Sequence, residues 1–232
     1  MPTVIKKKIK KKSVETETEV KDRLSDIRTS IKYRQKTVLT YSAAVLIIVI
    51  GITAFFLYRY SNNEKSRRLE YSAYKYYYNL YQQKPLSKQE QFQQAVDLFK
   101  KAYDKRNSPG LLFYIANSYY ELEKYDEALK TLNDLTKKYS GEKDIMPLVY
   151  QKMANIYRKT GKTEDALKTL DSLYKSEGNI YKDLALIESG RILEKNGKKT
   201  EAETKYKELI EKFPTSPYLS EAKNKTEEKK ES

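Results

Sequence analysis

A small residue recurs through the second part of the chain at spacings of 33, 38 and 36 residues, and this recurrence constrains the fold more than any other feature. The recurring residues, used below as reference alanines, are Ala95, Ala128, Ala166 and Ala202. Large residues follow them by four positions (Phe99, Leu132, Leu170 and Tyr206), and Ala102, Leu135, Leu173 and Leu209 follow by seven. Spacings of four and seven put side chains on one face of an α-helix, so each reference alanine lies on an amphipathic helix.

A second helix is predicted before each of the last three reference alanines. The matching columns stand nine residues before them (Tyr119, Tyr157 and Leu193), twelve before (Ala116, Ala154 and Gly190) and sixteen before (Leu112, Tyr150 and Leu186). Gly161 and Gly197 stand five before, where a tight turn would join the two helices. One such helix pair cannot bury its apolar face alone, so the pairs are expected to stack.

These columns resemble the tetratricopeptide repeat, in which small residues let two helices approach and aromatic residues fill the gap between them. The match is best over 150–173 and nearly as good over 112–135, whereas 186–209 departs at Ser189. The first repeat is distorted, because its helices (around Ala73 and Ala95) are separated by about ten extra residues. The resemblance implies an all-α solenoid over 86–224 that ends in a capping helix, followed by a frayed tail over 225–232.

Residues 38–57 form the longest apolar run, with twenty residues and no charge. As a helix they would be about 30 Å long, which is the hydrocarbon thickness of a bilayer. A buried core helix would be shorter, and a cleavable signal peptide would not have 37 residues before its apolar region. We therefore predict a single transmembrane signal anchor over 38–58, followed by a Tyr-rich membrane-proximal helix over 59–85 that also serves as the first helix of the repeats.

The first 37 residues carry 12 basic and 5 acidic side chains. This excess favours a cytoplasmic N-terminus and places the C-terminal 174 residues outside the cytoplasm. The segment is expected to be largely disordered, with a short helix over 17–35 before the membrane. Three interpretations of the lysine run at 6–12 remain open: a solvated tail, a segment attracted to anionic lipid, or a nucleic-acid-binding segment. No aromatic residue interleaves these lysines to stack on bases, so nucleic acid is not expected as a partner.

Composition excludes most enzyme chemistry. The 232 residues include no His, Cys or Trp and 7 Gly. A Ser-His-Asp triad, a His or thiolate metal site and a disulfide are therefore impossible, and neither common phosphate-binding glycine motif occurs. We expect no catalytic residue, no metal and no cofactor. A carboxylate-dependent hydrolase is the remaining enzymatic alternative, and the sequence indicates no inward-facing pair of carboxylates.

Candidate binding residues come from the first helix of each repeat, which lines the concave face of a tetratricopeptide solenoid. Eight positions are predicted to line this groove: Phe113, Asn117, Tyr120, Gln151, Asn155, Arg158, Ile187 and Arg191. Amides and a tyrosine suit a peptide backbone, and the two arginines suit an acidic chain end. The alternative is an ordinary solvated helix face.

Four tyrosines share one face of the helix after the membrane segment: Tyr71, Tyr74, Tyr78 and Tyr81. They are predicted either to pack on the first repeat or to form a contact surface for a membrane protein, since tyrosine is enriched at interfaces.

A basic tail, a single anchor and an extracytoplasmic repeat domain together resemble the bacterial YfgM-like family, which is ancillary to the Sec translocon. Two stretches carry this resemblance, 165–171 followed by Glu177-Gly178, and 187–202. It implies a non-enzymatic inner-membrane scaffold with a periplasmic domain, whose partners are translocon subunits, an envelope chaperone or exported chains. The stretch 213–218 is more typical of scaffolds for cell-division or outer-membrane assembly factors, which are the alternative. A homo-oligomer is also possible.

Overall fold

The computed structural model of the chain describes residues 17–80 and 86–227, and these divide into two compact units at residues 60 and 61. All the regular secondary structure in this described part is α-helical. The helices are α1 (Glu17–Tyr33), α2 (Gln35–Tyr77), α3 (Lys88–Lys105), α4 (Pro109–Glu121), α5 (Tyr125–Lys138), α6 (Met146–Lys159), α7 (Thr163–Lys175), α8 (Lys182–Lys195), α9 (Lys199–Lys212) and α10 (Leu219–Glu227). The all-α prediction is confirmed.

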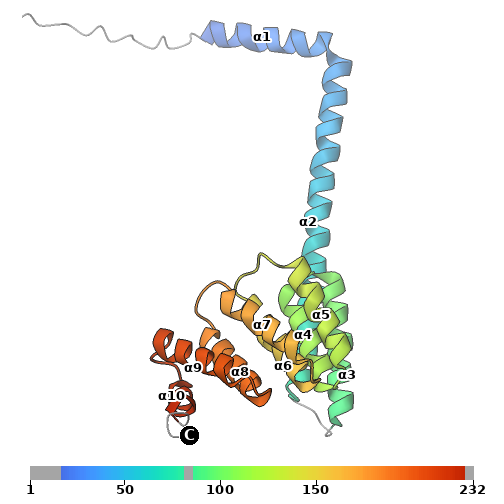
Figure 1. The fold of residues 1–232 in the computed structure, drawn as a ribbon. Helices are drawn as coiled ribbons and strands as arrows, with labels where there is room; N and C mark the ends of the chain where they lie inside the picture. Colours follow the sequence, from blue (N-terminus) through green and yellow to red (C-terminus); the bar gives the residue numbers. More distant parts are fainter. Residues whose placement is uncertain (1–16, 81–85, 228–232) are drawn as a thin grey trace, which may run out of the picture. The chain divides into compact units, whose positions relative to one another are not determined.

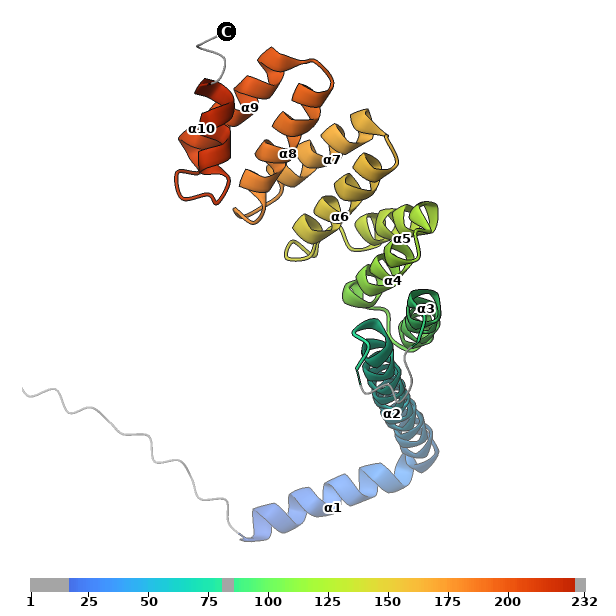
Figure 2. The same cartoon turned by 90° about the horizontal axis from the view of Figure 1, so that it is seen from below.

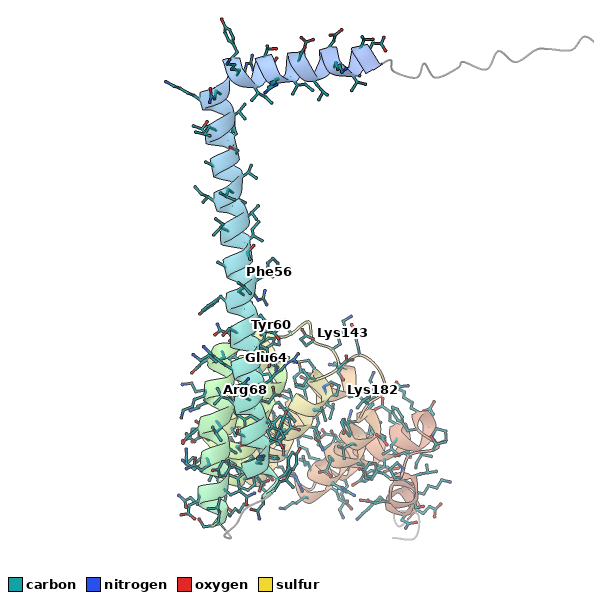
Figure 3. The ribbon with its side chains drawn as sticks, turned by 180° about the vertical axis from the view of Figure 1, so that it is seen from behind. Phe56, Tyr60, Glu64, Arg68, Lys143 and Lys182 are labelled. Atoms are coloured by element: carbon teal, nitrogen blue, oxygen red, sulfur yellow. The ribbon has the colours of Figure 1, made fainter. Side chains whose placement is uncertain are left out.

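The first unit holds α1 and the N-terminal part of α2, which includes the uncharged run 38–57. Within the described residues, α2 is the one helix long and apolar enough to cross a membrane, with a mean hydropathy of 2.4 over its most apolar window. No residue of that window is buried, and Figure 3 shows Phe56 and Tyr60 on the surface of this helix. Such exposure suits a helix whose solvent is lipid.

The second unit is a stack of helix pairs (Figure 1). The pairs α4–α5, α6–α7 and α8–α9 are the last three predicted repeats, and Figure 2 shows them following one another along the stack. The last turns of α2 form the first pair with α3. There the Ser66 hydroxyl donates a hydrogen bond of 2.9 Å to the carbonyl of Ala102, and Ala73 is fully buried. The prediction of a helical solenoid with tetratricopeptide-like repeats is therefore confirmed.

The column residues form the core because they are the ones that meet between helices. All four reference alanines are buried, as are Leu132, Leu173 and Leu209. Helix α6 is shared between two parts of this core, since Val149 and Ile156 pack toward α5 whereas Ala154 packs toward α7 and α8.

Gly190 permits the closest helix approach in the fourth repeat. A Cβ atom at this position would lie 2.7 Å from Cζ of Tyr206, whose ring is buried on α9. The small residue predicted twelve positions before Ala202 is therefore a steric requirement.

The short helix expected over 17–35 corresponds to α1 (Glu17–Tyr33), and α2 begins at Gln35. The C-terminal end differs from the expectation. Fraying was expected from residue 225, but α10 continues to Glu227, because Lys225 forms an ion pair of 3.1 Å with Glu194. The lysine run at 6–12 lies outside the described residues.

Candidate functional site

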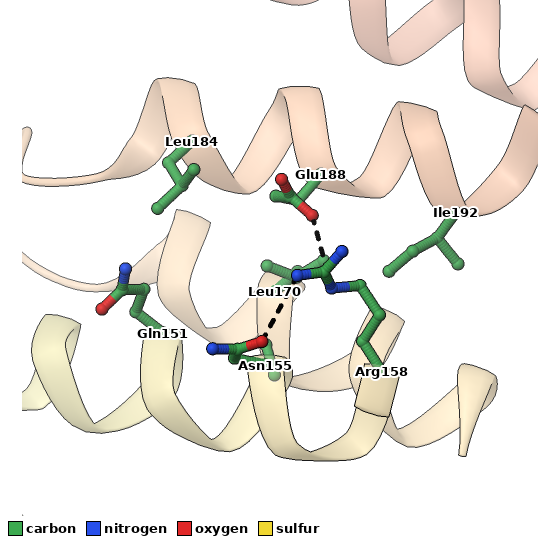
Figure 4. Close-up of a pocket in the computed structure, with 8 residues that line it drawn as sticks. Gln151, Asn155, Arg158, Leu170, Leu184, Glu188 and Ile192 are labelled. Carbon is green, nitrogen blue, oxygen red and sulfur yellow. Dashed lines mark hydrogen bonds and ion pairs between the residues drawn. The ribbon is translucent and has the colours of Figure 1, made fainter. Parts of the chain in front are cut away.

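A cavity of about 120 Å³ opens between α6 and α8 (Figure 4). Its polar rim comes from Gln151, Asn155 and Arg158 on α6 and from Glu188 on α8. Its apolar lining is formed by Ala154, Leu170, Leu184 and Ile192. A few convergent polar groups beside apolar side chains are typical of binding sites. Three of the eight predicted groove residues are therefore brought together here.

The rim residues form a chain of polar contacts. Arg158 donates a hydrogen bond of 3.3 Å to Oδ1 of Asn155, and its Nε lies 3.8 Å from a carboxylate oxygen of Glu188 (Figure 4). More than half of the Arg158 side chain is exposed. These contacts are long for charge-assisted pairs, so the guanidinium can exchange them for a ligand group.

A second cavity, of about 200 Å³, adjoins the first and shares Arg158, Glu188 and Ile192 with it. Arg191 and Lys195 add two further positive charges to its lining. Arg191 is already paired with Glu221 and Glu188, so Arg158 and Lys195 are the basic groups that this end of the groove can offer to an acidic group on a ligand.

Tyr120 lies beside this site at the junction of α4 and α6. Its hydroxyl accepts a hydrogen bond of 3.3 Å from the Asn155 amide. The ammonium groups of Lys152 and Lys159 lie 4.4 and 5.4 Å from the centre of its ring. Burial lowers the pKa of Lys152, although Glu121 opposes this effect. The ring therefore holds two cations in reach of the groove.

Asn117 and Phe113 lie deeper in the fold than predicted. Asn117 is 7% exposed, and its Oδ1 has no hydrogen-bond partner among the described residues. Phe113 is half-buried and packs against the Tyr114 ring.

Ile187 and Arg191 are covered by α10. Ile187 is fully buried in a cluster with Ala222, so the prediction that it lines an open groove is wrong. Arg191 donates hydrogen bonds of 2.8 and 2.5 Å to the carboxylate of Glu221, and another of 2.6 Å to Glu188. These two residues do not line the groove because α10 occupies the side of α8 where the first helix of a further repeat would pack.

Sequence reasoning missed the α8 residues that do line the cavity. Leu184, Glu188 and Ile192 are spaced by four, so they share a helix face. Glu188 and Ile192 each follow a predicted residue, Ile187 or Arg191, by one position, and Leu184 precedes Ile187 by three. The signal was present as this four-residue spacing on the side of α8 that faces the preceding repeat.

The tyrosines after the apolar run of α2 divide between packing and exposure. Tyr74 packs with Phe99 and Tyr114 at ring-centre distances of 5.2 and 4.8 Å. Tyr77 joins the same group, and burial raises its pKa to about 12. Tyr71 and Tyr78 are more than half exposed, although the Tyr78 hydroxyl lies 3.0 Å from that of Tyr114. Tyr81 lies outside the described residues.

Paired helices that meet at columns of small residues are also the pattern of a known protein family. The sequence profile of the tetratricopeptide repeat-like domain matches residues 36–225. The chain belongs to this family. No curated protein matches the sequence of this tetratricopeptide repeat-like chain.

Solved tetratricopeptide repeat proteins share its fold. One is a tetratricopeptide repeat protein from Parabacteroides merdae, with 17% sequence identity and a TM-score of 0.56 over 71% of this chain. The chain spans 59% of the length of that protein. A more distant similarity is to the TPR2AB domain of yeast Sti1 in a complex with pHSP90, with 18% identity and a TM-score of 0.40 over 64% of each chain. Tetratricopeptide repeats are in general protein-binding scaffolds without catalytic activity.

Proposed function

We propose that the groove between α6 and α8 binds an extended segment of another protein. The observation that carries this proposal is the cavity itself, in which amides and a guanidinium surround an apolar lining. Gln151 and Asn155 can hydrogen-bond a peptide backbone, while Leu170 and Leu184 can accept one apolar side chain. The basic groups of the adjoining cavity would favour an acidic residue or chain end next to that side chain.

The protein is anchored in a bacterial inner membrane, with its N-terminus in the cytoplasm and its repeats in the periplasm. The support for this part is the exposed apolar stretch of α2 and the excess of basic residues before it. An anchor raises the effective concentration of the groove near other membrane proteins without adding contacts.

Its partners are translocon subunits, an envelope chaperone or newly exported chains, and the protein assists Sec-dependent export without catalysing a reaction. The resemblance to the YfgM-like family supports this choice. The alternative, a scaffold for cell-division or outer-membrane assembly factors, is favoured by residues 213–218.

Site-specific photo-crosslinking in cells tests the proposal. One probe replaces Asn155 in the groove and a second replaces Tyr78, which is exposed near the end of α2. A control probe replaces Lys130, an exposed residue of α5 outside both cavities. Exported chains or a chaperone captured at Asn155, with translocon subunits captured at Tyr78, would support the export role.

Capture of division or assembly proteins at the same positions would support the alternative. Equal capture at Asn155 and Lys130 would contradict the binding groove, whichever partner is recovered.

A further inference from the structure

Helix α1 carries a stripe of apolar side chains that is exposed in the described structure. The stripe consists of Val20, Leu24, Ile27 and Ile31, whose exposed fractions are 40, 60, 55 and 48%. Their spacing of four, three and four residues places them along one side of the helix. Leaving four large aliphatic side chains in water is unfavourable, so this side is expected to have an apolar occupant.

Beyond the first turn of α1, which carries Glu17 and Glu19, the charges over 20–32 are sorted by sign around the stripe. At about 100° per residue, Arg23 and Arg28 lie on opposite borders of the stripe, about 70° from its centre, and Lys21 and Lys32 lie slightly further round. Asp22 and Asp26 lie on the far side of the helix. Long basic side chains at such a border can keep their stems on the apolar surface while their charges reach anionic groups. The far side, which is acidic, would face water.

This arrangement disfavours a second copy of the same helix as the occupant. In a parallel pair that used the stripe as its seam, Arg23 of one copy would face Arg28 of the other. In an antiparallel pair with the two stripes fully overlapped, Arg28 of one copy would face Lys21 of the other. The stripe is also shorter than the three heptads that sustain a coiled coil.

Helix α1 lies only a few residues before the uncharged run of α2. It ends at Tyr33, α2 begins at Gln35, and the uncharged run begins at Val38. A helix so close to a bilayer span is held at the membrane surface.

We propose that α1 lies in the plane of the cytoplasmic membrane surface, with the stripe in the acyl boundary and the flanking arginines on anionic lipid headgroups. This inference rests on the membrane anchor proposed above. It adds a lipid-binding element on the side of the membrane opposite the repeats.

Spin labelling of the full chain tests the inference cleanly, because the protein has no cysteine. Single cysteines replace Leu24 or Ile27 on the stripe, Asp22 or Thr29 on the far side, and Val49 within the span. Each labelled protein is reconstituted into vesicles of phosphatidylethanolamine and phosphatidylglycerol. Collisions of the label with oxygen, which prefers lipid, are compared with collisions with a water-soluble nickel complex.

We expect labels at 24 and 27 to show a several-fold loss of nickel collisions relative to labels at 22 and 29. The double variant Arg23→Gln/Arg28→Gln should reduce this difference in nickel collisions. The control double variant Asp22→Asn/Asp26→Asn should leave the difference in place, which is measured by comparing the label at 24 with the label at 29. In vesicles of phosphatidylcholine alone the difference should shrink.

Equal nickel access at 24 and 22, with the Val49 label protected, would overturn the inference and leave the anchor intact. An accessible Val49 label would overturn the anchor itself. Spin–spin broadening between labels at 24 would assign the stripe to a second copy and would also overturn the inference.

Discussion

The turns inside the last three repeats share a left-handed backbone conformation, although their residues differ. Gly161 and Gly197 have φ angles of 72° and 76°, and Glu123 stands at the equivalent position with a φ of 59°. A side chain in this region crowds the following carbonyl, which costs about 1–2 kcal/mol and which glycine avoids. The turn inside the second repeat therefore carries a local strain that the corresponding turns of the third and fourth repeats do not.

Replacing Glu123→Gly should raise the free energy of unfolding by about 1 kcal/mol, because the side chain is exposed and its removal loses little packing. The reverse change, Gly161→Ala, should lower it by a similar amount. Urea unfolding of the detergent-solubilised protein, followed by circular dichroism, measures both. A less stable Glu123→Gly variant would contradict the assignment of strain.

Gly190→Ala should be more damaging, because the new methyl group would collide with the buried ring of Tyr206. Overpacking of this kind costs about 1–3 kcal/mol. Gly141→Ala is the matched control, since no atom lies within 4 Å of the added Cβ there. Thermal melting should show a large shift for the first variant and a small one for the second. Adding Tyr206→Leu to Gly190→Ala should give a loss smaller than the sum of the two single losses.

At the scale of elements, α10 ends the stack by covering α8. Arg191 binds Glu221, Lys225 pairs with Glu194, and the Ser216 hydroxyl donates a hydrogen bond of 2.7 Å to Asp183 before the helix begins. Ala222 supplies the apolar contact. The side of α8 at the end of the array is thus covered by α10, the last helix of the described residues.

Acid should loosen α10. The hydrogen bond from Arg191 lowers the pKa of Glu221, with partial burial opposing it. A carboxylate whose pKa is lower when folded contributes stability above its unfolded pKa and loses it as the pH falls through the folded value. The melting temperature of the wild type should therefore fall more steeply below about pH 4 than that of Glu221→Gln. Parallel pH profiles for the two proteins would contradict this role.

The sequence predicted most elements because the repeat columns are themselves packing contacts. Ala116, Ala154 and Gly190 are small because helices touch there, so their spacing revealed the helix pairs. The burial of Ile187 could not be predicted in the same way, because it depends on the helix that packs after the fourth repeat. The columns treat each repeat alike, whereas α10 makes the last one different. Similarly, no glycine or proline separates 52 from 84, and α2 continues into the first repeat without a break that a sequence boundary could mark.

At the scale of the whole molecule, binding and stability should separate at the groove. Arg158 is largely exposed and its contacts are long, so Arg158→Ala should change the free energy of unfolding by no more than about 1 kcal/mol. The same change should reduce photo-crosslinking from the probe at Asn155 several-fold. Lys168→Ala, on the exposed part of α7, is the control for a lost positive charge. Unchanged capture in the Arg158 variant would remove this residue from the binding surface.

The aromatic group of the first repeat sets an order for maturation of the chain during synthesis. Tyr74 and Tyr77 on α2 pack against Phe99 on α3 and Tyr114 on α4. The ribosome releases the first of these rings before the last, so the C-terminal part of α2 cannot complete its packing until α4 has emerged. Each later pair then finds a finished surface on the pair before it. A polypeptide that is truncated before Tyr114 keeps the contacts of Tyr74 and Tyr77 with Phe99 but leaves all three rings without the ring that completes the group, so their exposure distinguishes an unfinished chain from a finished one.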